Sequence, residues 1–180
     1  MTADNPRVPL RDFFAGVAEY TFETRLGIAD PPLIDYISDL LTRFIRYDAL
    51  YSVRDLAGKR LEAVGEMLAE AEARQGDARR EVHRHIGDFA LFWTGVYPEA
   101  LRHAHSASPI KGDRFVDYCQ QGKRAYYIAS TIADDDGAHQ QVVLERLSYE
   151  FELCAFGLGE VRKEWERRDD GAGGHLVVIV

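Results

Sequence analysis

The sequence predicts an all-α protein, a single-domain bundle of about six mostly antiparallel helices over residues 1–168. Apolar residues recur in steps of three and four through almost every segment, as they do on the buried face of a helix. Glycine, proline and aspartate separate these segments, where one helix ends and the next begins. The chain has 180 residues, of which 46% are apolar and 29% charged. That size and composition suffice for one core without disulfides or metals.

The first two expected helices span residues 9–26 and 32–47. Gly27 is placed to end the first helix, and Asp30 with the two prolines that follow it forms a typical start for the second. Each helix has an apolar face, formed by Phe13, Val17 and Tyr20 in the first and by Leu33, Ile37, Leu40, Leu41 and Phe44 in the second.

The third and fourth expected helices span residues 55–74 and 77–96. Gly76 and Asp77 separate them, and Pro98 ends or kinks the fourth. The inward-facing residues are Leu61, Val64, Leu68 and Ala71 in the third helix and Val82, Ile86, Phe89, Trp93 and Val96 in the fourth.

The fifth and sixth expected helices span residues 113–133 and 138–168. The apolar residues of the sixth form a narrow seam, compatible with packing inside the bundle or with a coiled-coil dimer interface. This seam consists of Leu144, Leu147, Phe151, Cys154, Leu158, Val161 and Trp165. Gly157 and Gly159 lie in the same helix. They either admit a closely packed neighbour or allow the helix to open locally at a site.

Residues 169–180 are expected to form a Gly-rich linker and an apolar tail. The tail residues are Leu176, Val177, Val178, Ile179 and Val180. They either dock on the protein's own surface, stay unstructured, or form a peptide that a partner recognises or processes, for example by strand addition.

The charge balance bears on partners and location. The 22 Lys and Arg residues and 30 Asp and Glu residues give a net charge of −8. This charge disfavours nucleic acids and anionic membranes as partners, because both carry negative charge. No apolar run has the length of a signal peptide or a membrane helix, and the two cysteines lie far apart. We therefore expect a cytoplasmic protein. The sequence indicates no cofactor.

Glu81, His85 and Asp88 form the most prominent candidate site, because their spacing of i, i+4 and i+7 places them on one helix face. A half-buried histidine beside an aspartate titrates near neutrality or orients a ligand. The alternative is a structural histidine satisfied by a carboxylate of its own helix. Trp93 and Tyr97 supply aromatic rings that either line the same pocket or belong to the core.

Catalytic motifs of the common classes are absent, including GxxxxGK[ST], HExxH, CxxC and GxSxG. A di-iron bundle needs Glu-x-x-His on two helices, and this motif does not occur, so we predict no metal site. His83 and His85 point about 200° apart on a helix and cannot bind one metal together. Arg80 and His85 have the Arg-x4-6-His spacing of HEPN-type ribonucleases, which are also small all-α proteins. This spacing is expected by chance in the chain, and its acidic charge counts against an RNA enzyme.

The segment His85–Pro98, with Leu33–Phe44 upstream, resembles a family of bacterial all-helical proteins to which no activity is attached. The shared pattern is HxGDxxLFxxGxxP-like, with Gly87 and Asp88 at its core. The resemblance covers about residues 10–165. It implies an all-helical fold and assigns no functional site.

Three functions remain open at this point. The first is a non-enzymatic binding or regulatory module that self-associates as a homodimer or binds a protein partner. The second is an enzyme or sensor with a small-molecule pocket around Glu81, His85 and Asp88. The third is a carrier of a C-terminal peptide.

Overall fold

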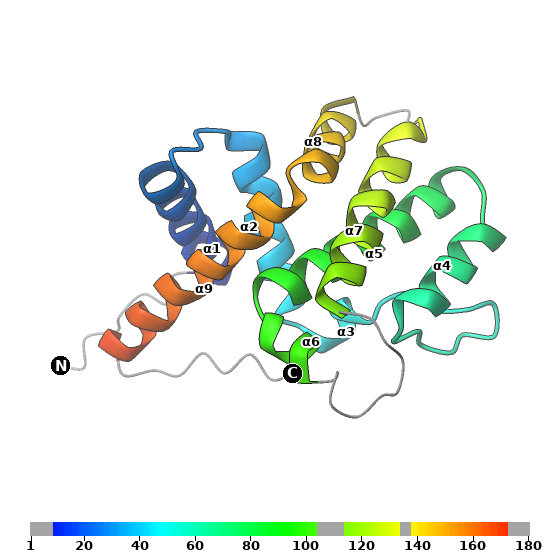
Figure 1. Cartoon of the computed structure of the whole chain (residues 1–180), viewed down its shortest axis with the longest axis horizontal. Coiled ribbons are helices and arrows are strands. Elements are labelled where there is room, and N and C mark those ends of the chain that lie inside the picture. The colour runs from blue at the N-terminus through cyan, green and yellow to red at the C-terminus, as the bar shows by residue number, and fades with distance from the viewer. Residues whose placement is uncertain (1–8, 104–113, 134–137, 173–180) are drawn as a thin grey trace.

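The computed structural model describes residues 9–103, 114–133 and 138–172, and this part of the chain is all-helical with no strand (Figure 1). The elements are α1 (Leu10–Glu19), the π-helix η1 (Tyr20–Arg25), α2 (Pro31–Phe44), α3 (Tyr47–Leu50), α4 (Val64–Ala73), α5 (Gly76–Gly95), α6 (Pro98–His103), α7 (Arg114–Thr131), α8 (Ala138–Tyr149) and α9 (Phe151–Ala172). None of these helices combines the length and apolar character needed to cross a bilayer.

Helix α5 occupies the centre of the fold. Its residues from His85 to Gly95 are all buried, and it packs most extensively against α7 while also contacting α2, α4 and α9. Helices α1 and α2 pack on each other, and α1 and η1 lie against α9 (Figure 1). The Asp30 carboxylate caps α2 by accepting a hydrogen bond from the Leu33 backbone N–H, as the sequence predicts.

Helix glycines allow the closest approaches in this core. A Cβ atom at Gly87 would lie 2.5 Å from the Tyr126 ring, and one at Gly157 would lie 2.5 Å from the Phe22 ring. At Gly159 the neighbour is the backbone oxygen of Gly95, at 3.3 Å. Gly157 and Gly159 of α9 therefore admit closely packed neighbours. The other predicted role, a local opening of the helix, is not needed to explain them.

The expected helix over residues 55–74 begins only at Val64. The Asp55 carboxylate accepts hydrogen bonds from two backbone N–H groups farther along the chain, and Gly58 adopts a positive φ of 83°. Both features close a tight turn, which replaces the first part of the predicted helix. Leu61 is buried as predicted, but it reaches the core from a non-helical segment.

The expected helix over residues 138–168 is divided at Glu150 into α8 and α9, and α9 continues to Ala172. The predicted seam on these helices is buried within this single chain. Of the two roles that the sequence left open for the seam, packing inside the bundle is therefore the one that this burial favours. The helix expected over residues 9–26 also differs from the prediction, because its second part, from Tyr20 to Arg25, is a π-helix.

Candidate ligand-binding pocket

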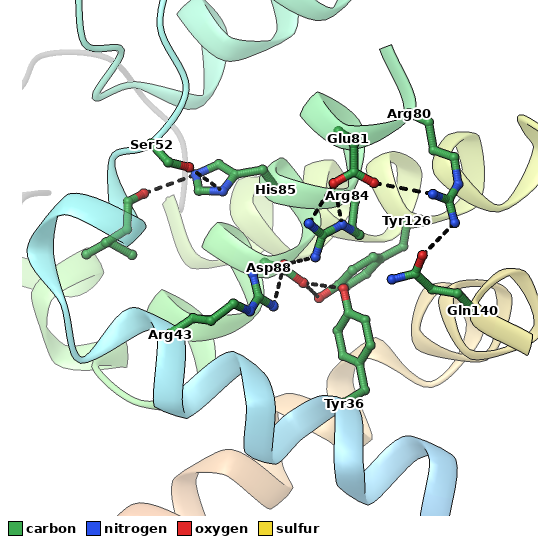
Figure 2. A network of polar contacts seen from close by, with 11 residues as sticks. Tyr36, Arg43, Ser52, Arg80, Glu81, Arg84, His85, Asp88, Tyr126 and Gln140 are labelled. Carbon is green, nitrogen blue, oxygen red and sulfur yellow. Dashed lines mark hydrogen bonds and ion pairs between the residues drawn. The ribbon is translucent and has the colours of Figure 1, made fainter. Parts of the chain in front are cut away.

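Asp88 is the centre of a buried polar cluster (Figure 2). Its side chain is 0% exposed and accepts hydrogen bonds from the Tyr36 hydroxyl at 2.6 Å and the Tyr126 hydroxyl at 2.8 Å. Arg43 Nη2 donates to Asp88 at 3.0 Å, and Arg84 Nη1 lies at 3.5 Å from the same oxygen. The donors come from α2, α5 and α7, so one carboxylate joins three helices.

The donors around Asp88 compensate the energetic cost of burying its charge. An ionised carboxylate is stable in a protein interior only when it is paired and hydrogen-bonded. Burial is the largest influence on Arg43 and Arg84 and lowers the pKa of each. Asp88, acting together with Tyr36 and with the carboxylates that accept their hydrogen bonds, more than offsets burial, so both pKa values are raised. Burial, and then the charge of Asp88, raises the pKa of Tyr36 and Tyr126 well above the usual value. Both tyrosines therefore stay protonated and keep donating.

A chain of polar contacts extends from this cluster to α8. Arg84 donates to Glu81 through Nε at 3.0 Å and Nη2 at 2.6 Å. Glu81 also accepts from Arg80 Nη1 at 3.3 Å, and Arg80 Nη2 donates to Gln140 Oε1 at 2.8 Å (Figure 2). The polar face of α5 is thereby connected to α2, α7 and α8.

His85 bonds to the segment that follows α2. Its Nε2 lies 3.0 Å from the Leu50 carbonyl oxygen, and its Nδ1 lies 3.3 Å from Ser52 Oγ. Burial lowers the pKa of His85, so the ring is neutral at pH 7. The Asp88 carboxylate, expected beside this ring, is directed to Tyr36 and Tyr126 instead (Figure 2).

These side chains border a cavity of about 390 Å³ between α2, α3, the end of α4 and α5. Its polar wall consists of Arg43, Ser52, Arg54, Arg74, Glu81, Arg84 and His85, and its apolar wall of Ala49, Val53 and Val82. The side chain of Arg43 is 36% exposed and that of Arg84 is 21% exposed, and both residues line the pocket.

The pocket has a local excess of positive charge in an otherwise acidic chain. Its four arginines are balanced by three carboxylates, Asp88, Glu81 and Glu70, which leaves one positive charge. Arg74 is fixed by Glu70 and by the Arg54 carbonyl oxygen, both at 2.8 Å. A guanidinium group has five N–H donors, so each arginine keeps donors beyond those used here. Such forks suit carboxylate and phosphate groups.

The structure separates the predicted site residues into three groups. Glu81 and His85 line the pocket together. Asp88 lies behind the pocket wall and holds two of its arginines. Trp93 and Tyr97 do not line this pocket, because they belong to an aromatic cluster farther along the chain.

In that aromatic cluster, the rings of Trp93 and Tyr97 pack on each other and both pack on Phe92. The guanidinium group of Arg162 lies 4.6 Å from the centre of the Tyr97 ring. These contacts give Trp93 and Tyr97 a packing role. Of the two alternatives that the sequence left open, lining the pocket or belonging to the core, the structure therefore favours the core.

The arginines and tyrosines of the site were not found from the sequence. Arg43 and Tyr36 are seven residues apart on α2, which places them on the same face of that helix. Arg84 precedes Asp88 by four residues, a spacing that favours an ion pair. Both spacings can be read from the sequence. Only the packing of α2 on α5 shows that Tyr36 and Arg43 come together with Arg84 and Asp88.

The burial of a second histidine, His83, was not predicted from the sequence. It is 0% exposed, and neither ring nitrogen has a hydrogen-bond partner among the residues that the structure describes. Burial, followed by the charge of Arg79, lowers its pKa, so the ring is neutral at pH 7.

Two other predictions concern metals and the tail. Over the described ranges, no group of three or more His, Cys, Asp or Glu side chains is arranged to hold a metal ion. The tail residues Leu176, Val177, Val178, Ile179 and Val180 lie outside the described part of the chain.

Comparison of the chain with known protein families, with curated proteins and with solved structures finds no match. The resemblance of His85–Pro98 to a bacterial helical family therefore stays a prediction.

Proposed function

We propose that the protein is a binding or regulatory module that takes up a small anionic ligand in the pocket between α2 and α5. The ligand's carboxylate or phosphate group would bind to Arg43 and Arg84. One observation carries this proposal: two partly exposed arginine side chains line the pocket, and the buried Asp88 holds both of them from behind.

The support from Asp88 favours binding because it orders both arginine side chains before a ligand arrives. Fixing a long side chain costs about 0.5–1.5 kcal/mol on binding, and this cost is smaller when the free protein already holds the side chain in place. The arginines nonetheless keep donors for a ligand, because each carries five N–H groups.

We propose binding without catalysis because the arginines that dominate the pocket stay charged near pH 7, which suits them to hold an anion and not to transfer a proton. A general acid or base works best when its pKa is close to the working pH. The pKa values of Arg43 and Arg84 are raised above an already high value, and that of His85 is lowered. The arginines thus stay charged and the histidine neutral.

Isothermal titration with inorganic phosphate, succinate and citrate tests the proposal. We expect Arg43→Met and Arg84→Met to weaken binding at least tenfold. Arg11→Met is the matched control, because Arg11 pairs with Asp39 on the surface and does not line the pocket. Absence of binding of all three anions to the unaltered protein would contradict the proposal.

Loss of Arg43 or Arg84 also removes a partner of Asp88, so a separate variant must isolate binding from folding. Arg54 lines the pocket, and its side chain donates to the Gly58 carbonyl oxygen at 3.1 Å. Arg54→Met should weaken anion binding severalfold without lowering the melting temperature.

A second candidate function is self-association, favoured by an exposed apolar row on α8 and α9. Tyr149, Leu153 and Phe156 are 68%, 41% and 57% exposed and follow helical spacing. We propose that this row, and not the buried seam, contacts a second copy or a protein partner. Sedimentation of the unaltered protein and of Phe156→Glu tests this. A monomer at all concentrations for both would contradict self-association.

We further propose that the helices form one mostly antiparallel bundle in the cytoplasm. Short connections favour antiparallel neighbours, and only residues 74–75 join α4 to α5. Cys119 and Cys154 are buried and not joined in a disulfide, which suits a reducing compartment.

A further inference from the structure

We propose that the ligand carries a hydroxyl group beside its anionic group, and that His85 Nδ1 accepts a hydrogen bond from that hydroxyl in place of Ser52. This inference rests on the proposed anion site, because the anionic group would be bound by Arg43 and Arg84. It adds a second recognition element and narrows the ligand to small hydroxylated anions.

The hydrogen bonds of His85 define which ring nitrogen carries the proton. The Leu50 carbonyl oxygen can only accept, so Nε2 at 3.0 Å from it must donate. A neutral imidazole then has a lone pair on Nδ1, which can only accept. Ser52 Oγ, at 3.3 Å, is the donor to that lone pair. Burial lowers the pKa of His85, which agrees with the neutral ring.

The contact between Ser52 and His85 is the weaker of the two. At 3.3 Å it is longer than the 3.0 Å contact between Nε2 and the Leu50 carbonyl oxygen. Ser52 is exposed and lies in the non-helical segment after α3, whereas the Leu50 contact is buried. A ligand hydroxyl can therefore replace Ser52 at Nδ1 while the ring stays fixed through Nε2.

An acceptor is uncommon in this pocket. The four arginines only donate, and the Glu81 carboxylate already accepts from Arg84 and Arg80. His85 Nδ1 consequently selects for a donor on the ligand. Hydroxy carboxylates and polyol phosphates share the required chemistry, an anionic group with a neighbouring hydroxyl. Both classes include molecules small enough for a cavity of about 390 Å³.

Matched pairs of ligands test the inference by titration calorimetry. Malate is compared with succinate, and glycerol 1-phosphate with propyl phosphate, so that each pair differs in hydroxyl groups and the two pairs separate carboxylates from phosphates. One neutral hydrogen bond favours the hydroxylated member by about two- to tenfold. We expect this preference in at least one pair.

Two variants assign the preference to His85. In His85→Gln the amide N–H can still donate to the Leu50 carbonyl oxygen, but the acceptor at Nδ1 is lost. The preference should then fall to about onefold while the non-hydroxylated ligand keeps its affinity. Ser52→Ala is the matched control, because it removes the competing donor and should keep or increase the preference. Melting temperatures verify that both variants fold.

Nitrogen-15 NMR of the histidine rings gives an independent measurement. In the free protein, Nε2 of His85 should be protonated and Nδ1 unprotonated, and the hydroxylated ligand should shift Nδ1. A protonated Nδ1, or equal affinity within both pairs with loss of binding in Arg43→Met, would overturn the inference and leave the anion site intact. Failure of all four ligands to bind would contradict both the hydroxyl preference and the proposed anion site.

Discussion

The ring of Tyr126 packs directly on Gly87, and its hydroxyl binds the next residue, Asp88, at 2.8 Å. A Cβ atom at Gly87 would lie 2.5 Å from the ring. The two consecutive residues have separate tasks: the glycine admits the ring, and the aspartate accepts its hydrogen bond. This relationship gives a physical reason for the Gly-Asp core of the His85–Pro98 segment.

Gly87→Ala should destabilise the protein by about 1–3 kcal/mol. The added methyl group would force the Tyr126 ring away, and overpacking of this kind outweighs the gain of roughly 1 kcal/mol in helix propensity. Urea denaturation measures the change. Gly65→Ala is the control, because Gly65 is exposed on α4 with nothing within 4 Å of its Cβ position. That variant should be stabilised by about 0.5–1 kcal/mol. Equal effects at both positions would refute the close-packing role.

Tyr126→Phe should lower the free energy of unfolding by about 1.5–3 kcal/mol. The substitution keeps the ring on Gly87 but removes one hydrogen bond to the buried charge of Asp88, and hydrogen bonds to charged groups are worth that amount. Chemical denaturation is the measurement, with Tyr127→Phe as the control because Tyr127 is 50% exposed. An unchanged stability of Tyr126→Phe would show that Asp88 does not need this donor.

The protein should lose stability as the pH falls below about 6.5, the usual pKa of histidine. Burial lowers the pKa of both His83 and His85 in the folded state. Below pH 6.5 the unfolded chain binds protons that the folded chain does not bind, so acid favours unfolding. Each histidine contributes up to about 1.4 kcal/mol per pH unit until its folded pKa is reached.

Denaturation curves at pH 7.5 and pH 5.5 measure this dependence. His83→Gln and His85→Gln should each reduce the difference in unfolding free energy between the two pH values. His139→Gln, on an exposed position of α8, should leave it unchanged. If neither buried-histidine variant alters the difference, the acid sensitivity arises from other groups.

Cys154 should not react with thiol reagents in the folded protein at pH 8. Its side chain is 0% exposed, and burial raises its pKa to about 12, so almost no thiolate is present. The reagent DTNB reports this, with the Cys119→Ser variant isolating Cys154. Labelling should appear only when denaturant is added. Rapid labelling under native conditions would mean that α9 separates readily from its neighbours.

Much of the fold could be predicted from local sequence patterns. The apolar residues from Val82 to Trp93 correctly indicated that α5 is a buried helix, and Asp30 marked the start of α2. The start of α4 was missed because Asp55 and Gly58 form a turn whose residues also fit a helical pattern.

The site was predictable only where its residues share one helix. Glu81 and His85 were found because both lie on α5, and both line the pocket. Arg43 precedes Asp88 by 45 residues and Tyr126 follows it by 38, so no local spacing connects them. Their meeting depends on how α2 and α7 pack on α5, which periodicity does not specify.

The position of Asp88 behind the pocket wall has a consequence for the evolution of this protein. The same carboxylate joins three helices and holds the guanidinium groups of Arg43 and Arg84. In the proposed anion site, substitutions at Ser52 or Arg54 can therefore alter ligand preference most easily, because neither residue contacts Asp88. A homologue that no longer binds the proposed ligand would still need the aspartate to hold its helices together. Conservation of Asp88 by itself would therefore not be evidence of binding.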